Sequence, residues 1–113
     1  MSRGDIDGIS DILRAIDRCE RYSVSLTSDD ADLANMAMDA VERNLQVVGE
    51  AANHLSRSVT ASHPEIPWPE IRGFRNILVH QYFSIDPDTL LDVIERHLPP
   101  LRKALAEQES KNA

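Results

Sequence analysis

Apolar residues recur every three or four positions in four separate segments, and this spacing limits the possible fold more than any other feature of the chain. Such a period lines up side chains along one face of an α-helix. Of the 113 residues, 42% are hydrophobic but only 4% are aromatic, so a core built from these faces must be mainly aliphatic. The pattern predicts an all-α fold with the helices in an up-and-down bundle.

The first two predicted helices span residues 5–22 and 30–55, and Ser28, Asp29 and Asp30 are suited to cap the second one. Gly49 lies inside the second helix, where a glycine costs up to about 1 kcal/mol relative to alanine if it is exposed. A close approach of another helix at Gly49 would explain its presence. The apolar residues expected to be buried in these two helices are Ile6, Ile9, Ile12, Leu13, Ile16, Cys19, Leu33, Met36, Ala37, Ala40, Val41, Leu45, Val48, Ala52 and Leu55.

Prolines at positions 64, 67 and 69 exclude a continuous helix through the middle of the chain. We predict a loop over residues 56–67, anchored in the core by Trp68. A third helix is expected over residues 69–80, because proline is favoured at the first position of a helix.

A fourth helix is predicted to begin at Pro87, behind a cap at Asp86. Consecutive prolines at positions 99 and 100 predict a kink or a short break inside it, and the polar tail after Glu107 is expected to fray. The helices would form one domain over residues 1–113. Because such a domain has a small core, burial of a further face in a homodimer would stabilise it.

The composition also excludes several classes of protein. The single cysteine, Cys19, cannot form an internal disulfide and is expected to be a small buried apolar side chain. No segment approaches the roughly 20 apolar residues that span a bilayer, and no N-terminal signal pattern is visible, so we expect a cytoplasmic protein with no membrane partner. A formal net charge of −7 counts against RNA binding through a broad basic surface, so any RNA contact would be local.

Metal and cofactor motifs are absent from the sequence: there is no phosphate-binding glycine loop and no zinc-type spacing of cysteine or histidine. The four histidines are far apart in the chain. His54 and His63 are expected to be solvated, and His97 to lie near the kink of the fourth helix, where it could sit at a helix end. We therefore expect no metal and no cofactor.

The segment from Arg75 to Tyr82 gathers groups that can cleave RNA without a metal. A histidine such as His80 can take the proton of the 2′-hydroxyl or give one to the leaving oxygen. The guanidinium of Arg75 can hold the scissile phosphate and stabilise the charge of the transition state. Asn76 can orient the phosphate or the histidine, and Tyr82 can do likewise or be modified itself.

Geometry leaves two arrangements of this segment open. Arg75 and His80 are five positions apart, about 140° around a regular helix, so either the helix is distorted near Val79 or a second chain completes the site. One histidine per chain supplies one acid or one base, whereas a symmetric dimer supplies both. The structural alternative is that Arg75 pairs with an acidic neighbour and His80 caps the helix end.

The spacing of Arg75, His80 and Tyr82 resembles the R-x4-H-x-Y signature of HEPN domains, and more narrowly of HepT-type toxins encoded beside a minimal nucleotidyltransferase antitoxin. Three further blocks resemble the same family, and the similarity covers about residues 5–105. Within the first block, Arg43 and Glu50 are candidates for a polar contact beneath the site or for simple surface pairs. The blocks are residues 43–52 (RNLQVVGEAA), 63–68 (HPEIPW) and 98–101 (LPPL).

This resemblance implies a homodimeric bundle of four or five helices that acts as a metal-independent endoribonuclease on cellular RNA, as the toxin of a toxin–antitoxin pair. Arg75 and His80 would be the catalytic residues, with Asn76 in support. Tyr82 would be the residue that the antitoxin blocks by transferring AMP from ATP, because added phosphate charge would repel RNA. The competing hypothesis is a non-catalytic helical module that docks a nucleotidyltransferase or a nucleotide.

Overall fold

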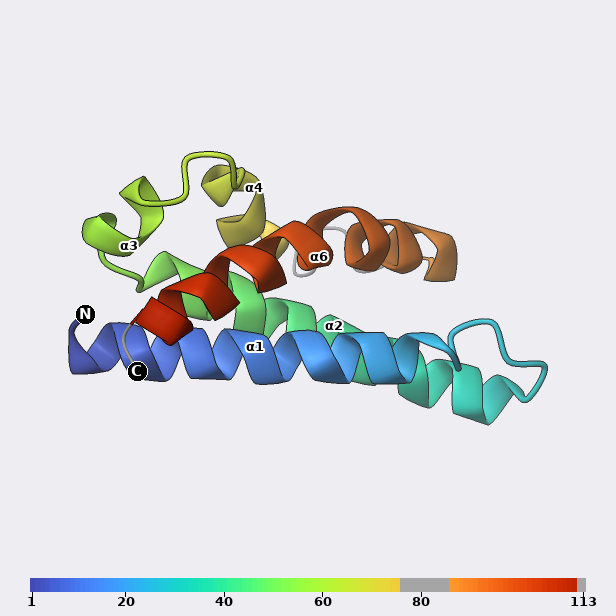
Figure 1. The fold of residues 1–113 in the computed structure, drawn as a ribbon. Coiled ribbons are helices and arrows are strands. Elements are labelled where there is room, and N and C mark those ends of the chain that lie inside the picture. The colour runs from blue at the N-terminus through green and yellow to red at the C-terminus, as the bar shows by residue number, and fades with distance from the viewer. Residues whose placement is uncertain (76–85, 112–113) are drawn as a thin grey trace.

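The computed structural model describes residues 1–75 and 86–111 and shows a bundle of helices (Figure 1). Within these ranges there are five helices and no strands, which confirms the predicted all-α fold. None of the helices in the described ranges is both long and apolar enough to cross a membrane. The helices are α1 (Arg3–Ser23), α2 (Ala31–Asn53), α3 (Arg57–Ala61), α4 (Trp68–Arg72) and α6 (Pro87–Lys111).

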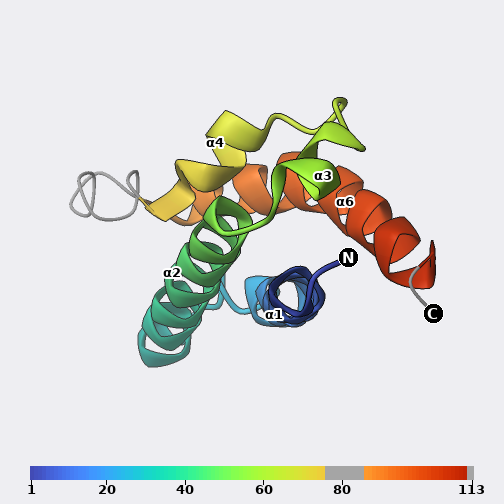
Figure 2. The ribbon, with the colours of Figure 1, turned by 90° about the vertical axis from the view of Figure 1, so that its left-hand side faces the viewer.

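The long helices α1 and α2 form an antiparallel pair, and the remaining helices are arranged around it (Figures 1 and 2). Helix α6 packs across α1, and α4 packs on α2. Arg102 of α6 reinforces the first of these contacts, because its Nη1 and Nη2 lie 2.6 Å from Asp17 and 2.9 Å from Glu20 of α1.

Each long helix begins at a side chain that caps its free backbone N–H groups. Ser2 Oγ accepts a hydrogen bond from the backbone of Asp5 at the start of α1. Asp30 Oδ1 accepts from two backbone N–H groups of α2 at 3.0 and 3.2 Å. Asp86 Oδ1 accepts from Thr89 N at 2.8 Å. Of the three candidate caps of α2, the structure selects Asp30, and it confirms the predicted cap at Asp86.

The buried core is mainly aliphatic, as the composition predicts, and Cys19 lies within it. Burial raises the pKa of the Cys19 thiol to about 12, with a smaller contribution from Glu20, so the thiol is inert at neutral pH. Three residues of the predicted apolar faces are exposed instead: Ile6, Leu33 and Met36, the last to 68%. The N-terminal part of α2, which carries Leu33 and Met36, lies away from α4 and α6, so α1 is the only long helix beside it in the described ranges (Figures 1 and 2).

The proline-rich connection is more ordered than a simple loop, because α3 forms inside the predicted loop over residues 56–67. Trp68 anchors this connection as predicted: it is 6% exposed, and its Nε1 donates to the carbonyls of Thr60 and His63. The prediction that His63 is solvated is wrong. Its ring is buried, with Nε2 at 3.0 Å from Gln108 Oε1 of α6 and Nδ1 at 3.4 Å from Glu65 Oε1.

Two helices differ in extent from the prediction. Helix α4 ends at Arg72, and a turn at Gly73, where glycine weakens the helix, separates it from Phe74 and Arg75, which are again helical. Residues 76–80 of the predicted third helix lie outside the described residues. Helix α6 continues through both of its prolines without a break and changes direction along its length (Figure 2), and it extends beyond Glu107 to Lys111. His97 therefore lies inside α6, against Phe74, and not at a helix end.

Asp5 ties the start of α1 to the residue that precedes α3. Its carboxylate is 3% exposed and accepts hydrogen bonds from Ser56 N at 2.8 Å and Ser56 Oγ at 2.7 Å. Burial by itself would raise the pKa of Asp5, but these hydrogen bonds and those from Ser2 bring the pKa below its usual value. Ser56 does not cap α3 with its side chain, because its hydroxyl donates a hydrogen bond to Asp5 instead.

Gly49 lies where α4 and the residues after it approach α2 most closely. A Cβ atom added at Gly49 would be 3.2 Å from Arg75 N, 3.2 Å from Ile71 O and 3.3 Å from Phe74 Cβ. The predicted close helix approach is therefore confirmed, and two of these three neighbours are backbone atoms that no rotamer change can move.

We expect Gly49→Ala to lower the free energy of unfolding by about 1 kcal/mol. The overpacking cost of about 1–3 kcal/mol should exceed the helix-propensity gain of up to about 1 kcal/mol. Urea unfolding followed by circular dichroism measures the change. Gly4→Ala is the matched control, because its Cβ would meet only Ser2 Oγ at 3.9 Å, and this variant should be no less stable than wild type. Equal stability of the two variants would contradict the prediction.

We expect Asp5→Ala to lower the free energy of unfolding at neutral pH by about 2 kcal/mol, because it removes hydrogen bonds to a buried charged group. The pKa of Asp5 is lower in the folded chain than its usual value of 3.8. Its stabilisation is therefore present above that value and is lost as the pH falls through the folded pKa. Urea unfolding from pH 7 to pH ~3 should show the difference from wild type shrinking below about pH 4. The exposed neighbour variant Asp7→Ala should show no such loss, and a difference independent of pH would contradict the assignment.

Candidate functional site

Arg75 is the only member of the predicted catalytic segment within the described residues. Asn76, His80 and Tyr82 lie outside them, so their roles stay predictions. Arg75 follows the turn at Gly73 and is exposed, with 44% of its side chain accessible to solvent. Its main chain is held against α2 by the contact at Gly49.

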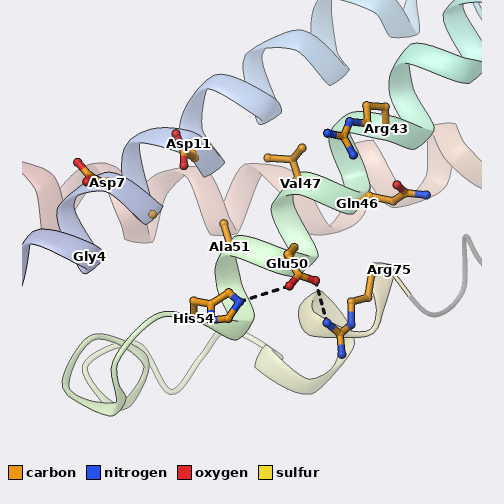
Figure 3. Close-up of a pocket in the computed structure, with 11 residues that line it drawn as sticks. Gly4, Asp7, Asp11, Arg43, Gln46, Val47, Glu50, Ala51, His54 and Arg75 are labelled. Carbon is orange, nitrogen blue, oxygen red and sulfur yellow. Dashed lines mark hydrogen bonds and ion pairs between the residues drawn. The ribbon is translucent and has the colours of Figure 1, made fainter.

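The guanidinium of Arg75 forms an ion pair with Glu50 of α2, with 2.8 Å between Nη1 and Oε2 (Figure 3). The other carboxylate oxygen of Glu50 faces His54 Nε2 at 3.3 Å, one helical turn further along α2. The carboxylate thus lies between two groups that can carry positive charge. Hydrogen bonds from Arg75 first, and then from His54, lower the pKa of Glu50 below its usual value, so Glu50 is ionised at neutral pH.

These contacts bear on two hypotheses from the sequence. Arg75 does pair with an acidic neighbour, as the structural alternative predicted. Glu50 forms exposed polar pairs, as one of the sequence alternatives expects, and its partners are Arg75 and His54. His54 is solvated as predicted, at 73% exposure, yet it belongs to the site. Its spacing of four residues from Glu50 is the helical pair spacing that could have revealed this contact.

A pocket of about 700 Å³ opens beside Arg75, between the N-terminal half of α1 and the C-terminal half of α2. This volume is within the range of small-ligand sites. Figure 3 shows that Asp7 and Asp11 come from α1, whereas Arg43 and Glu50 come from α2. The residues that line the pocket are Gly4, Asp7, Gly8, Asp11, Arg43, Gln46, Val47, Glu50, Ala51, His54 and Arg75.

Charge is divided unequally around this pocket. The α1 wall carries carboxylates, of which Asp11 is paired with Arg14 at 2.8 Å. The α2 wall and the segment after α4 carry Arg43 and Arg75, and the α2 wall also carries the carboxylate of Glu50. A phosphate group would therefore be attracted to the arginine side of the pocket and repelled from the α1 wall. Within residues 1–75 and 86–111, no three acidic, histidine or cysteine side chains are grouped closely enough to hold a metal ion.

Comparison with known proteins identifies the family of this bundle. The family model described as "Ribonuclease HepT-like" matches residues 12–107, which include both arginines of the pocket and the whole predicted signature. The chain belongs to the HepT-like ribonuclease family. Membership in this family confirms the resemblance seen in the four sequence blocks.

Two relatives match this HepT-like chain over nearly their full length. "Probable ribonuclease HepT" of Thermococcus cleftensis is 31% identical over 102 residues, which cover 90% of this chain and 93% of that protein. "Putative RNase MJ1380" of Methanocaldococcus jannaschii is 30% identical over 104 residues, or 91% and 95% of the two chains.

A third relative is longer than this chain. "Gamma-glutamylcyclotransferase and putative RNase MJ0434" of Methanocaldococcus jannaschii is 30% identical over 97 residues, which cover 86% of this chain but 44% of that protein. No solved structure matches the chain.

Proposed function

We propose that this HepT-like chain is the cytoplasmic toxin of a toxin–antitoxin pair and cleaves cellular RNA without a metal. Arg75 and His80 are its catalytic pair, and Asn76 supports them. The observation that carries the proposal is the position of Arg75, whose exposed guanidinium lies at the edge of a pocket in a member of a ribonuclease family.

The proposed reaction is an internal transesterification of RNA. The 2′-oxygen forms a bond to phosphorus while the bond from phosphorus to the 5′-oxygen breaks. One histidine takes the proton of the 2′-hydroxyl, and a second gives a proton to the departing 5′-oxygen. The guanidinium of Arg75 stabilises the additional negative charge on the phosphate oxygens in the transition state.

A homodimer supplies the two histidines, because each chain contributes one His80. The exposed apolar residues Leu33 and Met36 support this assembly, since they lie on α2, the helix that also carries Glu50. Burial of these side chains between two chains would remove apolar surface from water.

The acidic composition limits how RNA is held. With a net charge of −7 and carboxylates on the α1 wall, the protein offers phosphate a small number of cationic contacts, such as Arg43 and Arg75. RNA affinity would therefore depend weakly on salt, because few counterions are released.

The proposed partner is a minimal nucleotidyltransferase antitoxin that transfers AMP from ATP to Tyr82. In this transfer the tyrosine oxygen forms a bond to the α-phosphorus of ATP, and pyrophosphate leaves. The adenylated tyrosine adds negative charge two residues from His80, where it would repel the RNA backbone.

The purified protein should cleave RNA in the presence of EDTA. Arg75→Ala and His80→Ala should each reduce the rate by at least about 100-fold, because they remove phosphate stabilisation and proton transfer. Gel analysis of an end-labelled RNA measures cleavage, and a 2′,3′-cyclic phosphate product identifies the reaction.

The control for this experiment is the stability of the folded variants. The Arg75–Glu50 pair is exposed, so Arg75→Ala should leave the free energy of unfolding close to that of the wild type. Cutting by both variants at the wild-type rate would remove the assignment. Growth arrest on expression, relieved by His80→Ala, would argue against the non-catalytic docking module.

Incubation with the nucleotidyltransferase and ATP should add AMP to the wild-type chain and abolish RNA cleavage. Tyr82→Phe removes the acceptor oxygen, so this variant should keep its activity after the same treatment. Intact-mass spectrometry follows the modification, and labelling of Tyr82→Phe to the wild-type extent would place the modified residue elsewhere.

A further inference from the structure

Two consecutive residues of α2, Gly49 and Glu50, contact the backbone and the guanidinium of Arg75. Gly49 lets the backbone of Arg75 approach α2, since a Cβ at this position would lie 3.2 Å from Arg75 N. Glu50, the next residue, accepts a hydrogen bond from Arg75 Nη1 at 2.8 Å. One turn of a long, well-packed helix therefore determines where the main chain of Arg75 lies and where its guanidinium points (Figure 3).

The carboxylate of Glu50 is itself held in place. Its Oε2 faces Arg75 and its Oε1 faces His54 at 3.3 Å, so neither oxygen can turn without losing a contact. Within residues 1–75 and 86–111, Glu50 is the only acidic partner of Arg75. A guanidinium has five N–H donors, and a contact through Nη1 leaves other donors available to a phosphate.

The Glu50–Arg75 ion pair has opposite effects on RNA binding and on the chemical step. An exposed arginine samples many rotamers, and fixing its guanidinium before the reaction reduces the ordering needed in the transition state. The negative charge of Glu50, however, repels the phosphate that Arg75 binds. An ion pair that only competed with RNA would weaken RNA binding without assisting the chemical step.

We propose that Glu50 is a positioning residue for RNA cleavage: it orients the Arg75 guanidinium toward the scissile phosphate and takes no part in proton transfer. This inference rests on the proposed ribonuclease function and adds a residue outside the predicted signature. In this role Glu50 increases kcat but weakens the binding of RNA.

Kinetics of three variants test the proposal. Glu50→Ala should lower kcat by about 10- to 100-fold, as expected when a catalytic group is misplaced, while KM stays equal or falls because a negative charge is removed. Glu50→Gln keeps an oxygen that accepts from Arg75 and should recover most of kcat. Asp11→Asn removes the same charge from the same pocket but leaves Arg75 in contact with Glu50, so it should lower KM without the fall in kcat.

A second measurement does not depend on RNA cleavage. The order parameter of the Arg75 side-chain N–H group, measured by ¹⁵N NMR, should fall in Glu50→Ala and stay near the wild-type value in Asp11→Asn. An unchanged order parameter, or a wild-type kcat in Glu50→Ala, would overturn the positioning role alone. A rise in kcat/KM without loss of kcat would show competition with RNA and would also overturn it. Absence of cleavage by the wild-type protein would instead overturn the proposed function and this role with it.

Discussion

The contact between α2 and the segment that carries Arg75 depends on the missing side chain at Gly49. Backbone atoms of Ile71 and Arg75 lie 3.2 Å from the position that a Cβ would occupy there. Because backbone atoms cannot rotate away, only glycine allows this approach without displacement. The same contact brings Arg75 within hydrogen-bonding distance of Glu50, so helix packing and the geometry of the site have a common origin.

The proposed site is a way for an acidic protein to present a cation to a phosphate. The net charge is −7, and carboxylates of α1 line the pocket. Arg75 is nevertheless exposed and oriented by a single ionised carboxylate. Local geometry, and not the total charge, decides what such a pocket can bind, because interactions between exposed charges are screened beyond about 10 Å at moderate salt.

Several expectations from the sequence were wrong for one shared reason. Ile6, Leu33 and Met36 follow the apolar spacing of their helices, yet their side chains are exposed. His63 looks like an exposed loop residue, yet it is buried against Gln108 of α6, 45 positions away in the chain. Helical periodicity identifies a face that can be buried, but it does not say which element covers that face.

The sequence by itself determined what depends on neighbours within about one helical turn. Apolar spacing and capping groups predicted α1, α2 and α6, and Asp30 and Asp86 cap as expected because a cap acts on backbone groups two or three residues away. It also identified the resemblance of the chain to a ribonuclease family, which the family comparison confirms. Only the tertiary structure decided the partners of that arginine. Glu50 and Arg75 are 25 positions apart, and their contact exists because α2 and α4 pack together, a result of the whole core and not of any local pattern.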